Sequence, residues 1–83
     1  MSDLDLLNQN LAGEHFAIAA YDAGLSSGLL DEPTAKVARA FQSDHATHRD
    51  LLTEQVVARD GIAVSPLGAD DYAKSYPLLT NAA

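Results

Sequence analysis

The chain of 83 residues contains no cysteine, and this absence removes several kinds of chemistry. Disulfide bonds, thiolate zinc sites and cysteine nucleophiles are all excluded, and the redox compartment is left undetermined. Any metal ion must therefore be held by oxygen and nitrogen ligands.

Basic residues are also scarce, with 5 Lys and Arg against 12 Asp and Glu, for a formal net charge of -7. Without a basic cluster we expect no nucleic-acid partner, and an anionic membrane surface would repel the chain. The N-terminal residues MSDLDLLNQN lack a positive segment followed by an apolar one, and no apolar run approaches the roughly 20 residues that span a bilayer. We expect a soluble, cytoplasmic protein with no membrane partner.

We expect the chain to form one domain over residues 1–83. Residues typical of helix starts and ends divide it into two helices and a tail. A first helix is predicted over residues 3–26 and a second over residues 32–60, where Gly61 is suited to a left-handed conformation beyond the helix end. The short linker predicts an antiparallel hairpin. We expect residues 61–83 to lie across the hairpin as a strap, with one or two helical turns that end before Pro77.

Apolar residues recur in steps of three and four along both predicted helices, which is typical of helices that pack together. The first series contains one acid, Glu14, and consists of Leu4, Leu7, Leu11, Glu14, Ile18, Tyr21 and Leu25. The second series contains two imidazoles and consists of Ala38, Phe41, His45, His48, Leu52 and Gln55. A buried carboxylate must be paired, protonated or bound to a metal, so the three polar residues indicate a metal site or a hydrogen-bonded network.

A hairpin alone would leave its apolar residues in water, and a chain of this length gains only about 3–5 kcal/mol from its own core. We therefore predict at least a dimer, with two hairpins forming a four-helix bundle. A two-fold axis would bring Glu14, His45 and His48 of both chains into one core. Carboxylates and imidazoles suit iron, manganese, cobalt or zinc better than calcium or magnesium.

Three further residues are candidates for supporting roles at this site. Asp44 could orient a histidine, Tyr21 could hydrogen-bond a ligand or take part in electron transfer, and His15 lies beside Glu14. Other catalytic patterns are missing: His45 and His48 are three apart rather than four, with Ala46 where zinc proteases have glutamate, and no Gly-rich phosphate loop is present.

The runs LAGEHFAIAAYDAGLSSGLL and VARAFQSDHATHRDLLTEQVVARDGIAVSP resemble the first two helices of bacterial ferritin-like domain proteins. In di-iron members each helix pair gives one glutamate from its first helix and a Glu-x-x-His from its second. By this resemblance Glu14 matches the first glutamate and His48 the histidine, while His45 replaces the second glutamate. That departure favours a mononuclear, weakly coupled or lapsed site over a coupled di-iron centre.

The resemblance implies iron handling or oxidation, by a ferroxidase-type oxidoreductase that uses oxygen or peroxide. The chain would be either a half-length ferritin that completes its bundle by dimerising, as the short encapsulated ferritins do within a shell, or the front half of a longer protein. The alternative is a dimerisation module in which Glu14 and the histidines set the register without metal.

Overall fold

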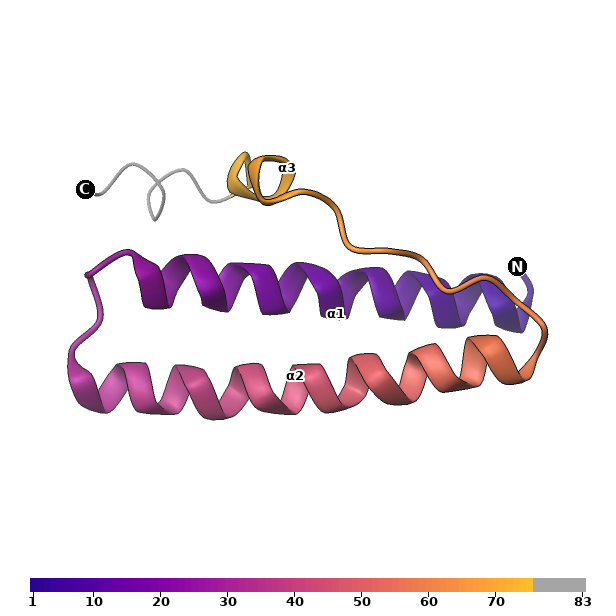
Figure 1. Cartoon of the computed structure of the whole chain (residues 1–83), viewed down its shortest axis with the longest axis horizontal. Helices are drawn as coiled ribbons and strands as arrows, with labels where there is room; N and C mark the ends of the chain where they lie inside the picture. The colour runs from indigo at the N-terminus through magenta and orange to yellow at the C-terminus, as the bar shows by residue number, and fades with distance from the viewer. Residues whose placement is uncertain (76–83) are drawn as a thin grey trace.

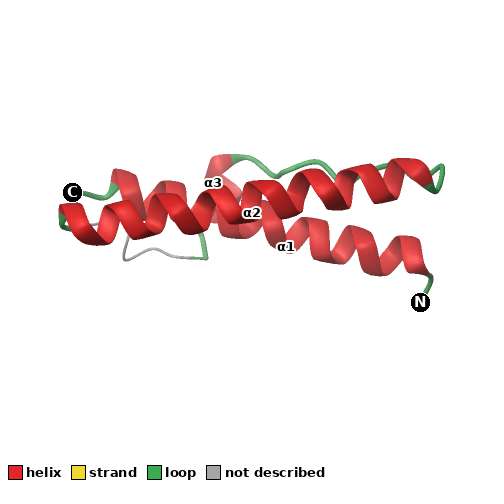
Figure 2. Cartoon of the chain, turned by 90° about the horizontal axis from the view of Figure 1, so that it is seen from below, coloured by secondary structure: helices red, strands yellow, loops and turns green. Residues whose placement is uncertain are grey.

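The computed structural model describes residues 1–75, and these form three helices and no strand. The two long helices, α1 (Asp3–Ser26) and α2 (Glu32–Ala58), run side by side in opposite directions (Figure 1) and cross at a shallow angle (Figure 2). A short helix, α3 (Ala69–Ala73), follows a segment that returns along α1. The predicted all-α hairpin is confirmed. The part of the expected strap from residue 76 onward, with Pro77, lies outside the described residues.

The first helix begins with a reciprocal cap. The Ser2 side chain accepts a hydrogen bond from the Asp5 N–H at 3.1 Å, and the Asp5 carboxylate accepts one from the Ser2 N–H at 3.3 Å. Both bonds satisfy N–H groups that have no partner within the helix. At the other end Gly28 has a φ of 77°, a left-handed conformation that glycine adopts without steric cost, and the chain turns there toward α2.

The second helix is capped by Asp31, whose Oδ1 accepts a hydrogen bond from the Thr34 N–H at 2.9 Å. Pro33 lies in the first turn, where its missing N–H costs nothing. Hydrogen bonds from the Thr34 side chain and then the Thr34 backbone hold the pKa of Asp31 below its ordinary value. A carboxyl group with a lowered pKa in the folded state stabilises the fold above its ordinary pKa, and this contribution is lost as the pH falls through the folded pKa.

We therefore expect Asp31→Asn, which keeps a capping oxygen but removes the charge, to lower the melting temperature relative to wild type at neutral pH. The difference between the two melting temperatures should narrow as the pH falls below the ordinary aspartate pKa of about 4 and through the lower pKa of Asp31 in the folded state. Thermal melts followed by circular dichroism between pH 2.5 and 7 measure both curves. A difference in melting temperature that stays constant over this pH range would show that the Asp31 charge contributes nothing to stability.

The end of α2 corrects the expected role of Gly61. The left-handed residue is Asp60, with a φ of 59°, and not Gly61. The Asp60 N–H donates to the Val57 carbonyl at 3.0 Å, and the Gly61 N–H donates to the Val56 carbonyl at 3.0 Å. These two bonds form a Schellman motif. The helix ends at Ala58, two residues before the expected boundary. Aspartate tolerates this conformation better than most residues.

Gly61 is required for space instead. A Cβ atom at this position would overlap Leu4 Cδ2 and would lie 3.1 Å from Val56 Cγ1 and 3.2 Å from the Val56 carbonyl oxygen. We expect Gly61→Ala to lower the free energy of unfolding by about 1–3 kcal/mol, the usual cost of overpacking. Gly68→Ala is the matched control, because its Cβ would meet only Asp71 Oδ2 at an ordinary 3.7 Å. Urea denaturation compares the variants, and equal stabilities would contradict this account.

The core between the long helices is small. Leu11 and Val56 are fully buried, and Ala35, Ala38 and Tyr72 are nearly so. Gln55, which was expected to face α1, is exposed, and this expectation was wrong because α2 turns its neighbour Val56 toward Leu4 and Gly61. Phe41, from the same expected series, is 52% exposed. The hairpin therefore buries only part of the apolar surface that its periodicity provides.

The segment after α2 lies along one side of α1 (Figure 1). The Asn8 carboxamide fixes it from both sides, since Nδ2 donates to the Ile62 carbonyl at 3.0 Å and Oδ1 accepts from the Val64 N–H at 2.9 Å. Further along, the rings of Phe16 and Tyr72 meet edge to face at 6.0 Å. Within residues 1–75, neither long helix is apolar enough to cross a membrane.

Candidate metal centre

Glu14 lies near the middle of α1, opposite two histidines of α2. Its Oε2 is 2.6 Å from His45 Nδ1, and its Oε1 is 3.7 Å from His48 Nδ1. Because an ionised carboxylate only accepts hydrogen bonds, the short contact requires a proton on His45 Nδ1. The hairpin thus brings together the three residues that the sequence pattern selected as metal ligands.

The three side chains of this group differ in how far they are exposed to solvent. The side chain of Glu14 is 19% exposed, that of His45 is 32% exposed and that of His48 is 58% exposed. Glu14 is thus held between the helices, while His48 reaches the surface of the hairpin. The group has a closed side toward the core and an open side toward solvent.

The donor atoms are close enough for one metal ion. One ligand atom from each of the three residues lies within 4.8 Å of the others. Two ligands at about 2.1 Å from one ion can be at most about 4.2 Å apart, so rotations of the side chains that move these atoms by less than about 1 Å would suffice. One carboxylate and two imidazoles form the donor set of non-haem iron(II) sites with open coordination positions. The residues present therefore fit a transition-metal ion.

His45 also contacts an aromatic ring of α1. The Tyr21 ring lies 5.6 Å from the His45 ring at an interplanar angle of 33°, and Phe41 follows at 6.5 Å from Tyr21. The structure therefore places Tyr21 beside a candidate ligand, although its hydroxyl group bonds neither Glu14 nor His45 within the described chain. The contact restricts the orientation of the His45 ring.

The other two supporting candidates lie apart from the three donors. His15 Nε2 is 3.0 Å from the Val64 carbonyl oxygen, so this histidine holds the segment that runs along α1. Asp44 is exposed, and its side chain makes no hydrogen bond or ion pair with residues 1–75. Both lie next to a candidate ligand in the sequence, but within residues 1–75 neither side chain forms a hydrogen bond or ion pair with one.

Gln42 was missed by the sequence reasoning. Its Nε2 donates to the Ile18 carbonyl at 3.0 Å and to Asp22 Oδ1 at 2.6 Å, which ties α2 to α1 one turn before His45. This bridge helps to fix the axial position of the histidines relative to Glu14. Its only sequence signal was a polar residue at the flank of the apolar series.

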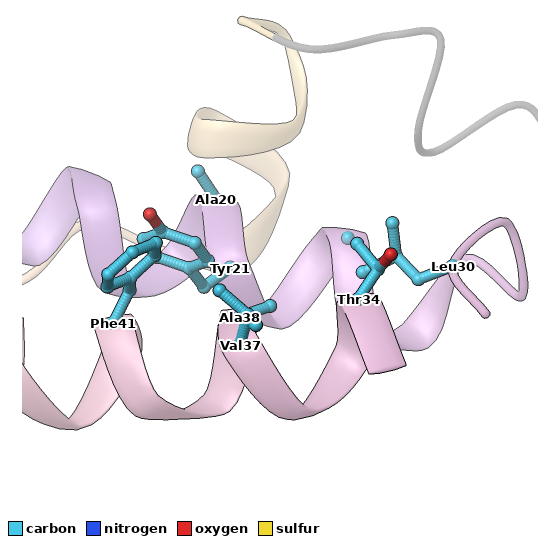
Figure 3. Close-up of a pocket in the computed structure, with 8 residues that line it drawn as sticks. Ala20, Tyr21, Leu30, Thr34, Val37, Ala38 and Phe41 are labelled. Atoms are coloured by element: carbon cyan, nitrogen blue, oxygen red, sulfur yellow. The ribbon is translucent and has the colours of Figure 1, made fainter. Parts of the chain in front are cut away.

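One side of the hairpin carries small and apolar residues together with Asp44 and His48, and we call it the open face. On α1 it consists of the exposed residues Leu6 and Gly13 and the half-buried residues Ala17, Ala20 and Gly24. On α2 it consists of exposed residues only: Val37, Phe41, Asp44, His48 and Leu51. A hollow of about 390 Å³ lies at the end of this face near the linker, lined by Ala20, Tyr21, Gly24, Leu30, Thr34, Val37, Ala38 and Phe41 (Figure 3). The candidate metal group borders the open face through His48.

Metal sites in helix bundles are commonly built from carboxylates and imidazoles on facing helices, as Glu14, His45 and His48 are placed here. The family model described as "Ferritin-like domain" matches residues 2–82, and the chain belongs to this family. The resemblance inferred from the sequence is thereby confirmed. No curated protein and no solved structure matches the chain.

Proposed function

We propose that this ferritin-like protein binds iron through Glu14, His45 and His48, and that it oxidises or otherwise handles iron with oxygen or peroxide as the oxidant. Two copies associate through their open faces into a four-helix bundle, and the two metal groups lie at the interface. The observation that carries the proposal is the convergence of one carboxylate and two imidazoles within 4.8 Å. Family membership supports iron over manganese, cobalt or zinc.

His45 sets the chemistry of the site apart from that of the di-iron pattern. A neutral imidazole in place of a bridging carboxylate removes one negative charge and one bridging ligand, which favours a single ion per group over a tightly coupled pair. Iron supplies a one-electron couple when bound. The protein supplies the partly buried carboxylate of Glu14, the imidazole nitrogens of two histidines and the Tyr21 ring, which lies beside His45.

The experiment is a thermal melt of chelator-treated protein under anaerobic conditions, with and without ferrous iron. A ligand that binds only the folded state stabilises it, by about 2.7 kcal/mol at a hundred times its dissociation constant. We expect iron to raise the melting temperature of the wild-type protein and to leave that of His48→Ala unchanged. Chelator added to iron-loaded protein should reverse the rise.

The 2.6 Å contact between His45 and Glu14 favours one other function, a dimerisation module whose buried hydrogen bond sets the register without metal. In that case neither iron nor chelator changes the melting temperature. The same melts therefore separate the two functions, and a wild-type protein indifferent to iron would overturn the proposal.

A further inference from the structure

Side-chain hydrogen bonds join α1 to α2 at two neighbouring places in the part of the chain that the structure describes. One is the bond between Glu14 and His45 in the candidate metal group. The other is the pair of bonds from Gln42 Nε2, which lies 3.0 Å from the Ile18 carbonyl oxygen and 2.6 Å from Asp22 Oδ1. Gln42 precedes His45 by three residues, about 4.5 Å, and Ile18 follows Glu14 by four, about 6 Å. Gln42 therefore lies next to the metal group, on the side of the linker.

Apolar packing between the long helices differs on the two sides of the metal group. Leu11 and Val56, which are both fully buried, lie on the side away from the linker. On the linker side the buried residues of α2 are Ala35 and Ala38, and Ala38 also lines the hollow of about 390 Å³. Because alanines are short and the hollow is unfilled, fewer interlocking side chains resist a slide of one helix along the other. The hydrogen bonds of Gln42 are therefore the main restraint on the axial register here.

The bond between Glu14 and His45 gives way when the same two atoms bind a metal ion. Glu14 Oε2 and His45 Nδ1 are 2.6 Å apart. Two ligands about 2.1 Å from one ion and at least 90° apart are separated by about 3.0 Å or more. Gln42 supplies no ligand to the group, so its bonds to α1 are retained when the bond between Glu14 and His45 opens.

We propose that Gln42 is a positioning residue of the metal group. It keeps His45 and His48 level with Glu14 both when the group is closed by its own hydrogen bond and when it holds an ion. The role in the metal-bound protein rests on the proposed function, which supplies the ion. The role in the metal-free protein does not.

The two acceptors of Gln42 make this restraint selective for one register. The Gln42 amide nitrogen carries two hydrogens, one for each acceptor, and Asp22 follows Ile18 by one helical turn. The bond to the Asp22 carboxylate, at 2.6 Å, is of the strong, charge-assisted kind. A slide of α2 by one residue, about 1.5 Å, would lengthen or misalign at least one of the two bonds.

Gln42→Met tests this role, because methionine has a similar length but has no N–H group to donate. Asn8→Leu is the matched control: the Asn8 carboxamide also makes two hydrogen bonds, but to Ile62 and Val64 of the segment after α2. We expect both variants to lower the melting temperature and only Gln42→Met to weaken ferrous binding, by about 10-fold. Gln42→Lys, whose ammonium group can donate to the same two acceptors, should recover most of the affinity.

The visible absorption spectrum of bound cobalt(II) shows whether the change reaches the metal group itself. Cobalt(II) suits the same carboxylate and imidazole donors, and its visible bands report the geometry of its ligands. At full occupancy Gln42→Met should alter these bands, whereas Asn8→Leu and Gln42→Lys should give the wild-type spectrum. A Gln42→Met protein with wild-type affinity and spectrum would overturn the positioning role and leave the proposed function standing. An equal loss of affinity in Asn8→Leu would also overturn it, because general destabilisation would then explain both.

A comparison without metal separates this inference from the proposed function. If Gln42 and the bond from His45 to Glu14 maintain one register together, losing either weakens the other. The drop in melting temperature of Gln42→Met combined with Glu14→Ala should then be smaller than the sum of the two single drops. Asn8→Leu combined with Glu14→Ala should be additive, since Asn8 lies six residues, about 9 Å, from Glu14.

Additive drops for Gln42→Met and Glu14→Ala would overturn the role of Gln42 in the metal-free protein. A wild-type protein that binds no ferrous iron would overturn the proposed function, and the metal-free comparison would still decide the role of Gln42. If Gln42→Met does not fold, Asp22→Ala replaces it in all three experiments, because it removes one of the two bonds. The expected changes are then smaller and in the same direction, and wild-type behaviour of Asp22→Ala would contradict the proposal.

Discussion

Glu14→Gln should leave the hairpin folded and weaken ferrous binding by on the order of 100-fold or more. Changes at residues that merely orient metal ligands cost about 10- to 100-fold in affinity, and a direct carboxylate ligand should cost at least as much. The amide is nearly isosteric and can still accept the hydrogen bond from His45 Nδ1, which is 2.6 Å from Oε2 in the wild-type protein. Anaerobic titration with a competing chromophoric chelator measures the affinity.

Glu54→Gln is the matched control, because Glu54 is an exposed glutamate on α2 whose replacement changes the net charge by the same amount. It should bind iron as wild type does. A Glu14→Gln protein that bound iron equally well would remove Glu14 from the site. Loss of binding in both variants would indicate attraction by the overall negative charge instead of a defined group.

Leu11→Ala should have the largest effect on stability, lowering the free energy of unfolding by about 2–5 kcal/mol. Leu11 is fully buried and lies one turn before Glu14, where it fills the space between the long helices. A domain of this size gains only about 3–5 kcal/mol from its core, so the variant should be largely unfolded unless dimerisation or metal stabilises it. Far-ultraviolet circular dichroism in increasing urea gives the measurement.

Leu29→Ala removes the same atoms from a side chain that is 59% exposed in the linker, and it should change stability by no more than about 0.5 kcal/mol. Similar losses in the two variants would mean that the packing at Leu11 is not what holds the helices together. A large loss at Leu11 alone supports the small core described here.

Local patterns were sufficient to predict the helices and the meeting of the candidate ligands. Ser2 and Asp31 begin α1 and α2 through side-chain caps that a short stretch of sequence reveals. Glu14, His45 and His48 interrupt apolar series of period three and four and lie at similar distances from the short linker, so an antiparallel hairpin brings them to similar depth. The metal-binding role assigned to them stays a prediction.

Features that depend on contacts between distant residues cannot be predicted from the local sequence pattern. Whether Gln55 or Val56 faces α1 differs by a rotation of about 100°, and contacts with Leu4 and Gly61 decide it. The left-handed residue after α2 is Asp60, one position before the expected Gly61, and both residues are suited to that conformation. The contacts of Asn8 and His15 join residues about fifty positions apart, and no local pattern indicates which carbonyl groups they meet.

Native mass spectrometry of protein exposed anaerobically to ferrous iron tests the central claim most directly, because it reports assembly and metal content together. The proposed function predicts an even-numbered oligomer that carries about one or two metal ions per pair of chains. A dimer that stays free of metal in excess ferrous iron would contradict the account and would leave Glu14, His45 and His48 as a hydrogen-bonded network.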